Sequence, residues 1–274
     1  MKIKITVFFL LLVTLLFSCK KDDSLNVGNN GTLKVPLLSK VLIDNQSAYE
    51  YTYTDSNLFS EIKSKFDYTI HHYNTKGQLI TTDFYVNDNI LSGDPTVFQT
   101  ALNSKELVTP ANGKKSGTIT YEYNNNGQLT KTTYIQPLLS SSEYSDFTCD
   151  NNNRISRQTM YWANVATGYI DYTYDTKGNL NSEMLYNIPS SGTAELITVK
   201  QYGFDNAPNP YKSASRLMIP GINTNPNNLI KETYTVHKSA AQGPDNVQVT
   251  TNSYTYNDMG YPVSKNGNVS YVYK

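Results

Sequence analysis

The chain has 274 residues, and its 23 Lys and Arg balance 23 Asp and Glu. Phosphate binding needs an accumulation of basic side chains, and no basic stripe is present, so we expect no nucleic-acid partner. The only two cysteines are Cys19 and Cys149, which excludes a fold held together by several disulfides. We therefore expect burial and strand pairing to hold the fold.

Residues 1–18 have the features of a lipoprotein signal peptide. A basic "MKIK" precedes an apolar run that is short for a membrane span. Leu16-Phe17-Ser18-Cys19 resembles the lipobox of bacterial lipoproteins, which implies cleavage before Cys19 and lipid attachment to it. The following "CKKDD" resembles tracts that accompany surface display in Bacteroidetes lipoproteins. We expect the protein to be attached to the outer membrane through this N-terminal lipid and to face the cell surface. The alternative is a soluble secreted protein in which this Cys is incidental.

Residues 19–36 are polar, rich in Asn and Gly, and without periodicity, which is typical of a flexible tether. Residues 37–274 contain no Pro- or Ser-rich linker. Single all-β domains reach about 250 residues, so we expect one domain over this range.

A short unit recurs along this domain, and its clearest copy is "YTYDTKGNL" at Tyr172. The related copies are YTYTDSNLF at Tyr51, HHYNTKGQL at His71, YEYNNNGQL at Tyr121, FTCDNNNRI at Phe147, YGFDNAPNP at Tyr202 and YTYNDMGYP at Tyr254. Each is predicted to be a β-hairpin, with Asp or Asn opening the turn and Gly or Asn at a position of positive φ. Gly127, Gly178, Asn57 and Asn153 occupy that position.

Side-chain alternation assigns the faces of each predicted hairpin. In the copy at Tyr121, alternation places Tyr121, Tyr123, Leu129 and Ile135 on the buried face, with Thr132 facing away. In the copy at Tyr172, the same reasoning places Ile170, Tyr172, Tyr174, Leu180, Met184 and Tyr186 on the buried face.

These units resemble YD repeats, the hairpins of rearrangement-hotspot (RHS) proteins, teneurins and YD-repeat lipoproteins of Bacteroidetes, most of which have no assigned function. The resemblance covers most of the chain after residue 50 and implies a long antiparallel meander. Seven copies make too little wall for a closed shell. A sheet of a dozen or more twisted strands curls, so we expect an all-β half-barrel or incomplete barrel. A transmembrane barrel has the same two-residue alternation, but its outward face is apolar. In this chain we expect Thr, Glu, Lys and Asn on the outward face.

No catalytic, cofactor or metal site is predicted. The adjacent His71 and His72 point to opposite faces of a strand, which hinders ligation of one metal ion, and His237 stands alone. The Asn-rich turns lack the acidic ligands of a calcium loop. A hydrolase acting on polysaccharide or cell-wall material through dispersed acidic residues remains an alternative, although no motif indicates it.

The predicted function is non-catalytic binding of a glycan, a peptide or a partner protein. The hairpin at Phe147 suggests a surface for it. Alternation places Phe147, Cys149, Ile155, Thr159 and Tyr161 on the buried side, so that Trp162 faces away from the core. If the strand ending near Ile135 returns at about Glu143, Tyr134 is opposite Tyr144, and Tyr144 is opposite Met160. The candidate binding surface is therefore Tyr134, Tyr144, Met160 and Trp162.

Overall fold

The computed structural model describes residues 35–87, 106–136, 143–212, 219–221, 224–238 and 243–274. The predicted signal peptide, Cys19 and the tether up to residue 34 lie outside the described residues. Residues 36–274 form one compact unit. None of the described segments forms a helix with the length and hydropathy that a membrane span requires.

The described residues form a single sheet of seventeen strands. Its first nine strands are β1 Leu38–Ile43, β2 Gln46–Tyr53, β3 Phe59–Ser64, β4 Asp67–Tyr73, β5 Leu79–Asn87, β6 Gly113–Tyr123, β7 Leu129–Ile135, β8 Glu143–Cys149 and β9 Ile155–Trp162. The others are β10 Val165–Tyr174, β11 Leu180–Asn187, β12 Glu195–Pro208, β13 Asn227–Val236, β14 Asn246–Thr251, β15 Tyr254–Tyr256, β16 Pro262–Lys265 and β17 Val269–Tyr273.

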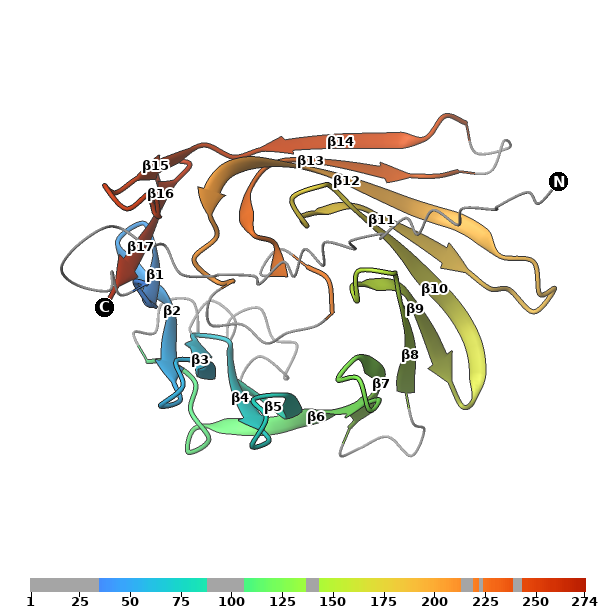
Figure 1. Ribbon diagram of the computed structural model, residues 1–274, viewed down its shortest axis with the longest axis horizontal. Helices are drawn as coiled ribbons and strands as arrows, with labels where there is room; N and C mark the ends of the chain where they lie inside the picture. Colours follow the sequence, from blue (N-terminus) through green and yellow to red (C-terminus); the bar gives the residue numbers. More distant parts are fainter. Residues whose placement is uncertain (1–34, 88–105, 137–142, 213–218, 222–223, 239–242) are drawn as a thin grey trace, which may run out of the picture. The chain divides into compact units, whose positions relative to one another are not determined.

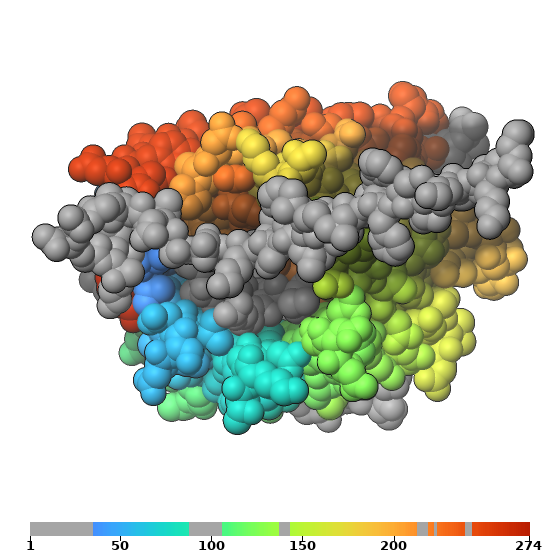
Figure 2. Space-filling model, viewed as in Figure 1, coloured from blue at the N-terminus to red at the C-terminus, as the bar shows by residue number. Residues whose placement is uncertain are grey.

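Each strand from β1 to β13 pairs antiparallel with the next one along the chain. Strands β15, β16 and β17 continue the meander, and β17 pairs back onto β1. Between β14 and β15, no ladder is present in the described residues, so the sheet curls without closing (Figure 1). The predicted incomplete barrel is confirmed. In Figure 2 the colours of the sequence pass from blue through cyan to green along the lower side of the view.

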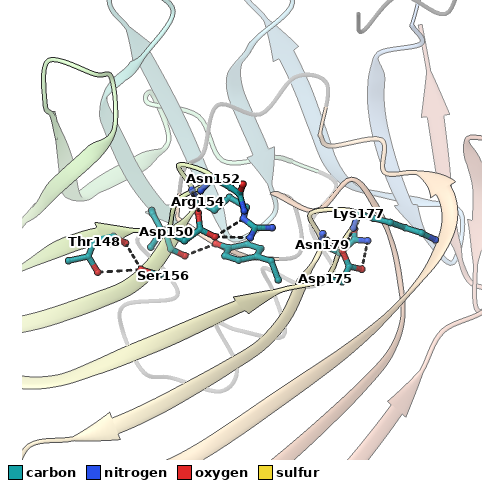
Figure 3. Close-up of polar contacts among 10 residues, drawn as sticks. Thr148, Asp150, Asn152, Arg154, Ser156, Asp175, Lys177 and Asn179 are labelled. Carbon is teal, nitrogen blue, oxygen red and sulfur yellow. Dashed lines mark hydrogen bonds and ion pairs between the residues drawn. The ribbon is translucent and has the colours of Figure 1, made fainter. Parts of the chain in front are cut away.

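The turns have the predicted chemistry. Gly127 and Gly178 have φ values of 77° and 87°, and Asn57 and Asn153 have 59° and 61°. The first turn residue accepts two backbone hydrogen bonds, as at Asp175, whose Oδ1 accepts from the N–H groups of Lys177 and Asn179 at 2.8 Å each. Figure 3 shows this turn beside that of Asp150, which accepts from Asn152 and Arg154 in the same way. The side chain therefore satisfies donors that the turn removes from the ladder.

A β-bulge recurs in every copy, one residue after the position that Leu129 occupies. Tyr123 pairs with Leu129 but Glu122 pairs with Lys131, so Thr130 is an extra residue. The extra residues of the other copies are Ser60, Ile80, Ser156, Asn181, Ile230 and Val263. Because an extra residue shifts the alternation by one, everything after it on the second strand faces the opposite way from a regular strand.

The bulge overturns the predicted faces of the second strands. Thr132 pairs with Tyr121 and is buried, whereas Ile135 pairs with Thr118 and is 53% exposed. In the copy at Tyr172, residue 186 pairs with Tyr169, so Met184 and Tyr186 lie on the face opposite Tyr172. The predictions for the first strands and for Leu129 and Leu180 hold, because those residues precede the bulge.

Two core clusters form on the face that carries the Tyr-x-Tyr side chains, which we call the inner face. One contains Leu38, Val41, Tyr51 and Phe59; the other contains Leu129, Phe147, Ile155, Tyr172 and Leu180. The chain between β12 and β13 packs onto both, Tyr211 onto the first cluster and Ile219 onto the second.

Tyrosine hydroxyl groups connect neighbouring copies at the bulges. The second Tyr of a copy donates to the carbonyl that begins the second strand of the preceding one. These bonds join Tyr73 to Phe59 at 2.7 Å, Tyr123 to Leu79 at 2.8 Å and Tyr174 to Ile155 at 2.7 Å. A bulge interrupts the ladder at that point, so the hydroxyl supplies a donor from outside it. The abundance of Tyr thus has a structural cause besides its ring.

Replacing Tyr123 by Phe is expected to lower the free energy of unfolding by about 1 kcal/mol, because the Leu79 carbonyl loses its hydroxyl donor. Burial raises the pKa of Tyr123 to about 12, so the hydroxyl remains a donor at neutral pH. The measurement is urea unfolding of both chains. Tyr49→Phe is the control, because the Tyr49 hydroxyl has no hydrogen bond within the described residues; it is expected to change stability by less than about 0.5 kcal/mol. Equal losses in the two variants contradict the role of the bulge carbonyl.

Candidate functional site

The four predicted surface residues come from β7, β8 and β9, but in a different register from the predicted one. Tyr134 pairs with Glu143, and Glu143 pairs with Trp162. Tyr144 pairs with Tyr161 rather than with Met160. The prediction was wrong by one residue, because the bulge at Ser156 shifts the alternation of β9.

The faces change accordingly. Met160 pairs with Ser145, and Trp162 is two residues further on, so both point to the inner face, the same face as Phe147. Thr159 and Tyr161, predicted to be buried with Phe147, lie on the opposite face. The indole of Trp162 is nevertheless 44% exposed, since it lies at the end of β9, beyond the core cluster.

All four residues border one cavity of about 580 Å³, which we call the Trp162 cavity. Its other lining residues are Ile119, Thr132, Glu143, Ser145, Gln158, Tyr161, Thr167 and Ile219. Tyr144 and Tyr161 also border the cavity, although they pair with each other on the opposite face of the sheet. Their rings stack there with centroids 4.6 Å apart. The Lys131 ammonium lies 4.2 Å from the Tyr144 ring centroid. Aromatic rings and uncharged polar groups thus share the wall of the cavity.

A chain of hydrogen bonds fixes the polar part of this wall. Gln158 donates through Nε2 to the Ser145 hydroxyl at 3.0 Å and accepts at Oε1 from the Tyr172 hydroxyl at 2.9 Å. The amide orientation is therefore determined at both ends. Burial raises the pKa of Tyr172, so its hydroxyl remains protonated. Gln158 is held as part of a rigid wall.

Gly117 makes room for Tyr134. A Cβ atom built at Gly117 would lie 2.5 Å from Cε2 and 2.8 Å from the hydroxyl of Tyr134. Glycine at this position of β6 thus lets the Tyr134 ring lie against the neighbouring strand. The placement of this ring beside the cavity depends on a residue that carries no side chain of its own.

Sequence reasoning missed the polar residues of the cavity, Glu143, Ser145 and Gln158. Alternation without a bulge places Gln158 on the face opposite Phe147, whereas in the structure the two residues pair and share the inner face. The sequence signal that could have found them is the position equivalent to Leu129. A bulge at the next residue in one copy implies the same bulge, and the same change of face, in the other copies.

The histidines lie apart from this cavity. His71 is buried on β4 and its Nδ1 lies 3.1 Å from the Thr82 hydroxyl, while His72 is exposed and lies 3.5 Å from Asp83. Their opposite faces are as predicted. Nδ1 of His237 lies 2.7 Å from Oδ2 of Asp245. Among the described residues, no group of three or more metal-ligating side chains is present.

Cys149 replaces the second Tyr of its copy and packs against the core cluster that contains Leu129. Burial, followed by the charge of Asp150, raises the pKa of its thiol. The interpretation of Cys149 as a small core residue agrees with this environment, since a reactive thiol needs a lowered pKa.

The comparisons with known proteins give remote similarities. No family model and no curated protein matches the sequence. A porin-like protein from Bacteroides uniformis ATCC 8492 is similar at TM-score 0.40 and 12% identity, over 86% of this chain and 98% of its own. One from Bacteroides vulgatus ATCC 8482 is similar at TM-score 0.40 and 11% identity, over 87% and 99%. A protein with unknown function from Bacteroides fragilis NCTC 9343 is similar at TM-score 0.25 and 12% identity, over 67% and 91%.

TM-scores this low support no statement about function. The resemblance to YD repeats therefore rests on the sequence pattern, and function has to be argued from the site. The fold and the cavity together define a curled, all-β protein with an aromatic cavity near the end of β9.

Proposed function

We propose that this chain is a non-catalytic glycan-binding module and that the Trp162 cavity is its binding site. The observation that carries the proposal is the half-exposed indole beside Tyr134, Glu143 and Gln158 in one cavity of about 580 Å³. Ring faces stack on the apolar faces of sugars, and carboxylate and amide groups bond to hydroxyls. The cavity is within the size range of small-ligand sites, so it fits a short oligosaccharide.

Two features favour a glycan over a peptide or a protein partner. The cavity wall contains uncharged hydroxyl and amide groups next to the rings, which match a ligand rich in hydroxyls. Glu143 adds a carboxylate to the described part of the wall, and a carboxylate accepts hydrogen bonds from sugar hydroxyls. A peptide or a protein that competes for the cavity on equal terms contradicts this choice.

The test is a glycan array probed with the full chain in detergent, followed by titration with the sugars that bind. Trp162→Ala is expected to weaken binding by at least roughly tenfold, since a central aromatic side chain carries much of the binding energy. Val165→Ala is the matched control, because Val165 is exposed and pairs with Trp162 but does not line the cavity. Acrylamide is expected to quench the single Trp. A protected indole, or equal binding by both variants, contradicts the proposal.

A second variant tests the geometry without removing an aromatic ring. Gly117→Ala forces the Tyr134 ring away, so binding weakens although every lining residue is retained. Unchanged affinity in this variant excludes Tyr134 from the site.

The hydrolase alternative requires two carboxylates facing one substrate. Among the described residues that line the Trp162 cavity, Glu143 is the single carboxylate. A glycosidase pair would therefore have to form elsewhere, and release of reducing sugar from a bound glycan is the measurement that decides for it.

We further propose that Cys19 carries lipid and anchors the protein in the outer membrane at the cell surface. The support is the lipobox-like Leu16-Phe17-Ser18-Cys19 after an apolar run. Cells grown with a fatty-acid probe are expected to label the wild-type chain and leave Cys19→Ala unlabelled and released from the membrane. Cys149→Ala, which retains Cys19, is the control and should label normally. Equal labelling of the Cys19 variant excludes the anchor.

A further inference from the structure

Two further cavities lie along the inner face, and they share one wall. The first, of about 440 Å³, lies over the cluster of Tyr51 and Phe59. The second, of about 340 Å³, lies beneath the connection between β12 and β13. Three residues line both: Tyr211, Lys265 and Tyr271. Either cavity is large enough for a ligand of monosaccharide size.

Lys265 is the cation of this shared wall. It is half-buried at the end of β16, and its ammonium has no ion pair or hydrogen bond within the described residues. Burial lowers its pKa. The hydroxyl of Tyr271, on the paired strand β17, also has no hydrogen bond there. Two donors on one wall are thus without a protein acceptor.

The side chains that line the second cavity favour an anion. Its lining residues are Asn209, Pro210, Tyr211, Ile219, Gly221, Thr224, Asn228, Leu229, Tyr254, Lys265 and Tyr271, and none of them is acidic. In the first cavity, the acid is Asp67, whose carboxylate accepts a hydrogen bond from the Ser64 hydroxyl, and the buried His71 has its pKa lowered to about 4 and is neutral. Lys265 is the one charged side chain among the described residues that line the second cavity, and this charge favours an anionic ligand there.

We propose that the second cavity binds the carboxylate of an acidic sugar, with Lys265 as the charge partner and Tyr271 as a hydrogen-bond donor. The Tyr211, Tyr254 and Tyr271 side chains line the same cavity and supply apolar surface for the sugar ring. This site shares Ile219 with the Trp162 cavity, but Lys265 and Tyr271 do not line that cavity, and the proposal does not depend on glycan binding there. Its ligand class is a uronic acid, free or at the end of a chain.

The test is calorimetric titration of the full chain in detergent with sodium galacturonate, and with galactose as the neutral analogue. Galacturonate is expected to bind at least roughly tenfold more tightly than galactose, because the analogue leaves the ammonium without a partner. Lys265→Met should abolish that preference, Lys265→Arg should retain it, and Tyr271→Phe should weaken galacturonate binding. Trp162→Ala is expected to bind galacturonate like the wild type.

The proposal is overturned by absence of galacturonate binding, by equal affinity for the two sugars, or by wild-type behaviour of Lys265→Met. Loss of binding in Trp162→Ala places the sugar in the other cavity and also overturns it. Acetic anhydride labelling separates a lost site from a lost fold. Galacturonate should protect Lys265 of the wild-type chain while leaving Lys177, on an exposed turn, equally reactive.

Discussion

Replacing Leu129 by Ala is expected to lower the free energy of unfolding by about 2 to 5 kcal/mol, the range for a large aliphatic side chain truncated in a packed core. Leu129 is completely buried and touches the cluster that contains Phe147, Ile155 and Leu180. Its removal leaves a cavity between neighbouring copies, which rigid strands on both sides cannot close. Urea unfolding, followed by circular dichroism, measures the change.

Ile135→Ala is the matched control for this prediction, because a regular strand would place both side chains on the same face. The bulge at Thr130 turns Ile135 outward, where it is 53% exposed. Its truncation is expected to cost less than about 1 kcal/mol, mainly through lower β-propensity. Similar losses for Leu129→Ala and Ile135→Ala contradict the bulge.

Replacing Gly178 by Val is expected to lower the free energy of unfolding by about 1 to 3 kcal/mol, because a β-branched residue is strained at positive φ. The φ of Gly178 is 87°. A Cβ atom there would lie 3.9 Å from the nearest heavy atom, Cγ of Pro226, so the cost comes from the backbone rather than from a clash.

Gly178→Asn is the control for this turn. The equivalent positions of other copies hold Asn57 and Asn153 at φ values of 59° and 61°, so the fold accepts Asn there. The Asn variant is expected to cost clearly less than the Val variant in the same urea titration. Equal losses would mean that bulk, and not the backbone conformation, makes glycine necessary.

The turns and the first strand of each hairpin could be predicted from the sequence, since both depend on neighbours along the chain. An Asp or Asn side chain bonds to its own turn, and Gly or Asn accepts positive φ three residues later. Tyr-x-Tyr then fixes which face of the first strand is buried. These local rules placed Tyr121, Tyr123 and Leu129 correctly.

Only the tertiary structure decided the faces of the second strands, and with them the site. A bulge depends on the pairing of two strands. The backbone carbonyl beside it accepts a hydrogen bond from a Tyr hydroxyl of the next copy, as the Leu79 carbonyl does from Tyr123. Side-chain alternation alone does not show where a bulge falls, so Trp162 was assigned to the wrong face and Gln158 was missed. The cavities arise later still, from the curl of the whole sheet and from the chain between β12 and β13. That connection brings Tyr211 next to Lys265 and Tyr271, residues that the sequence keeps more than fifty positions apart from it.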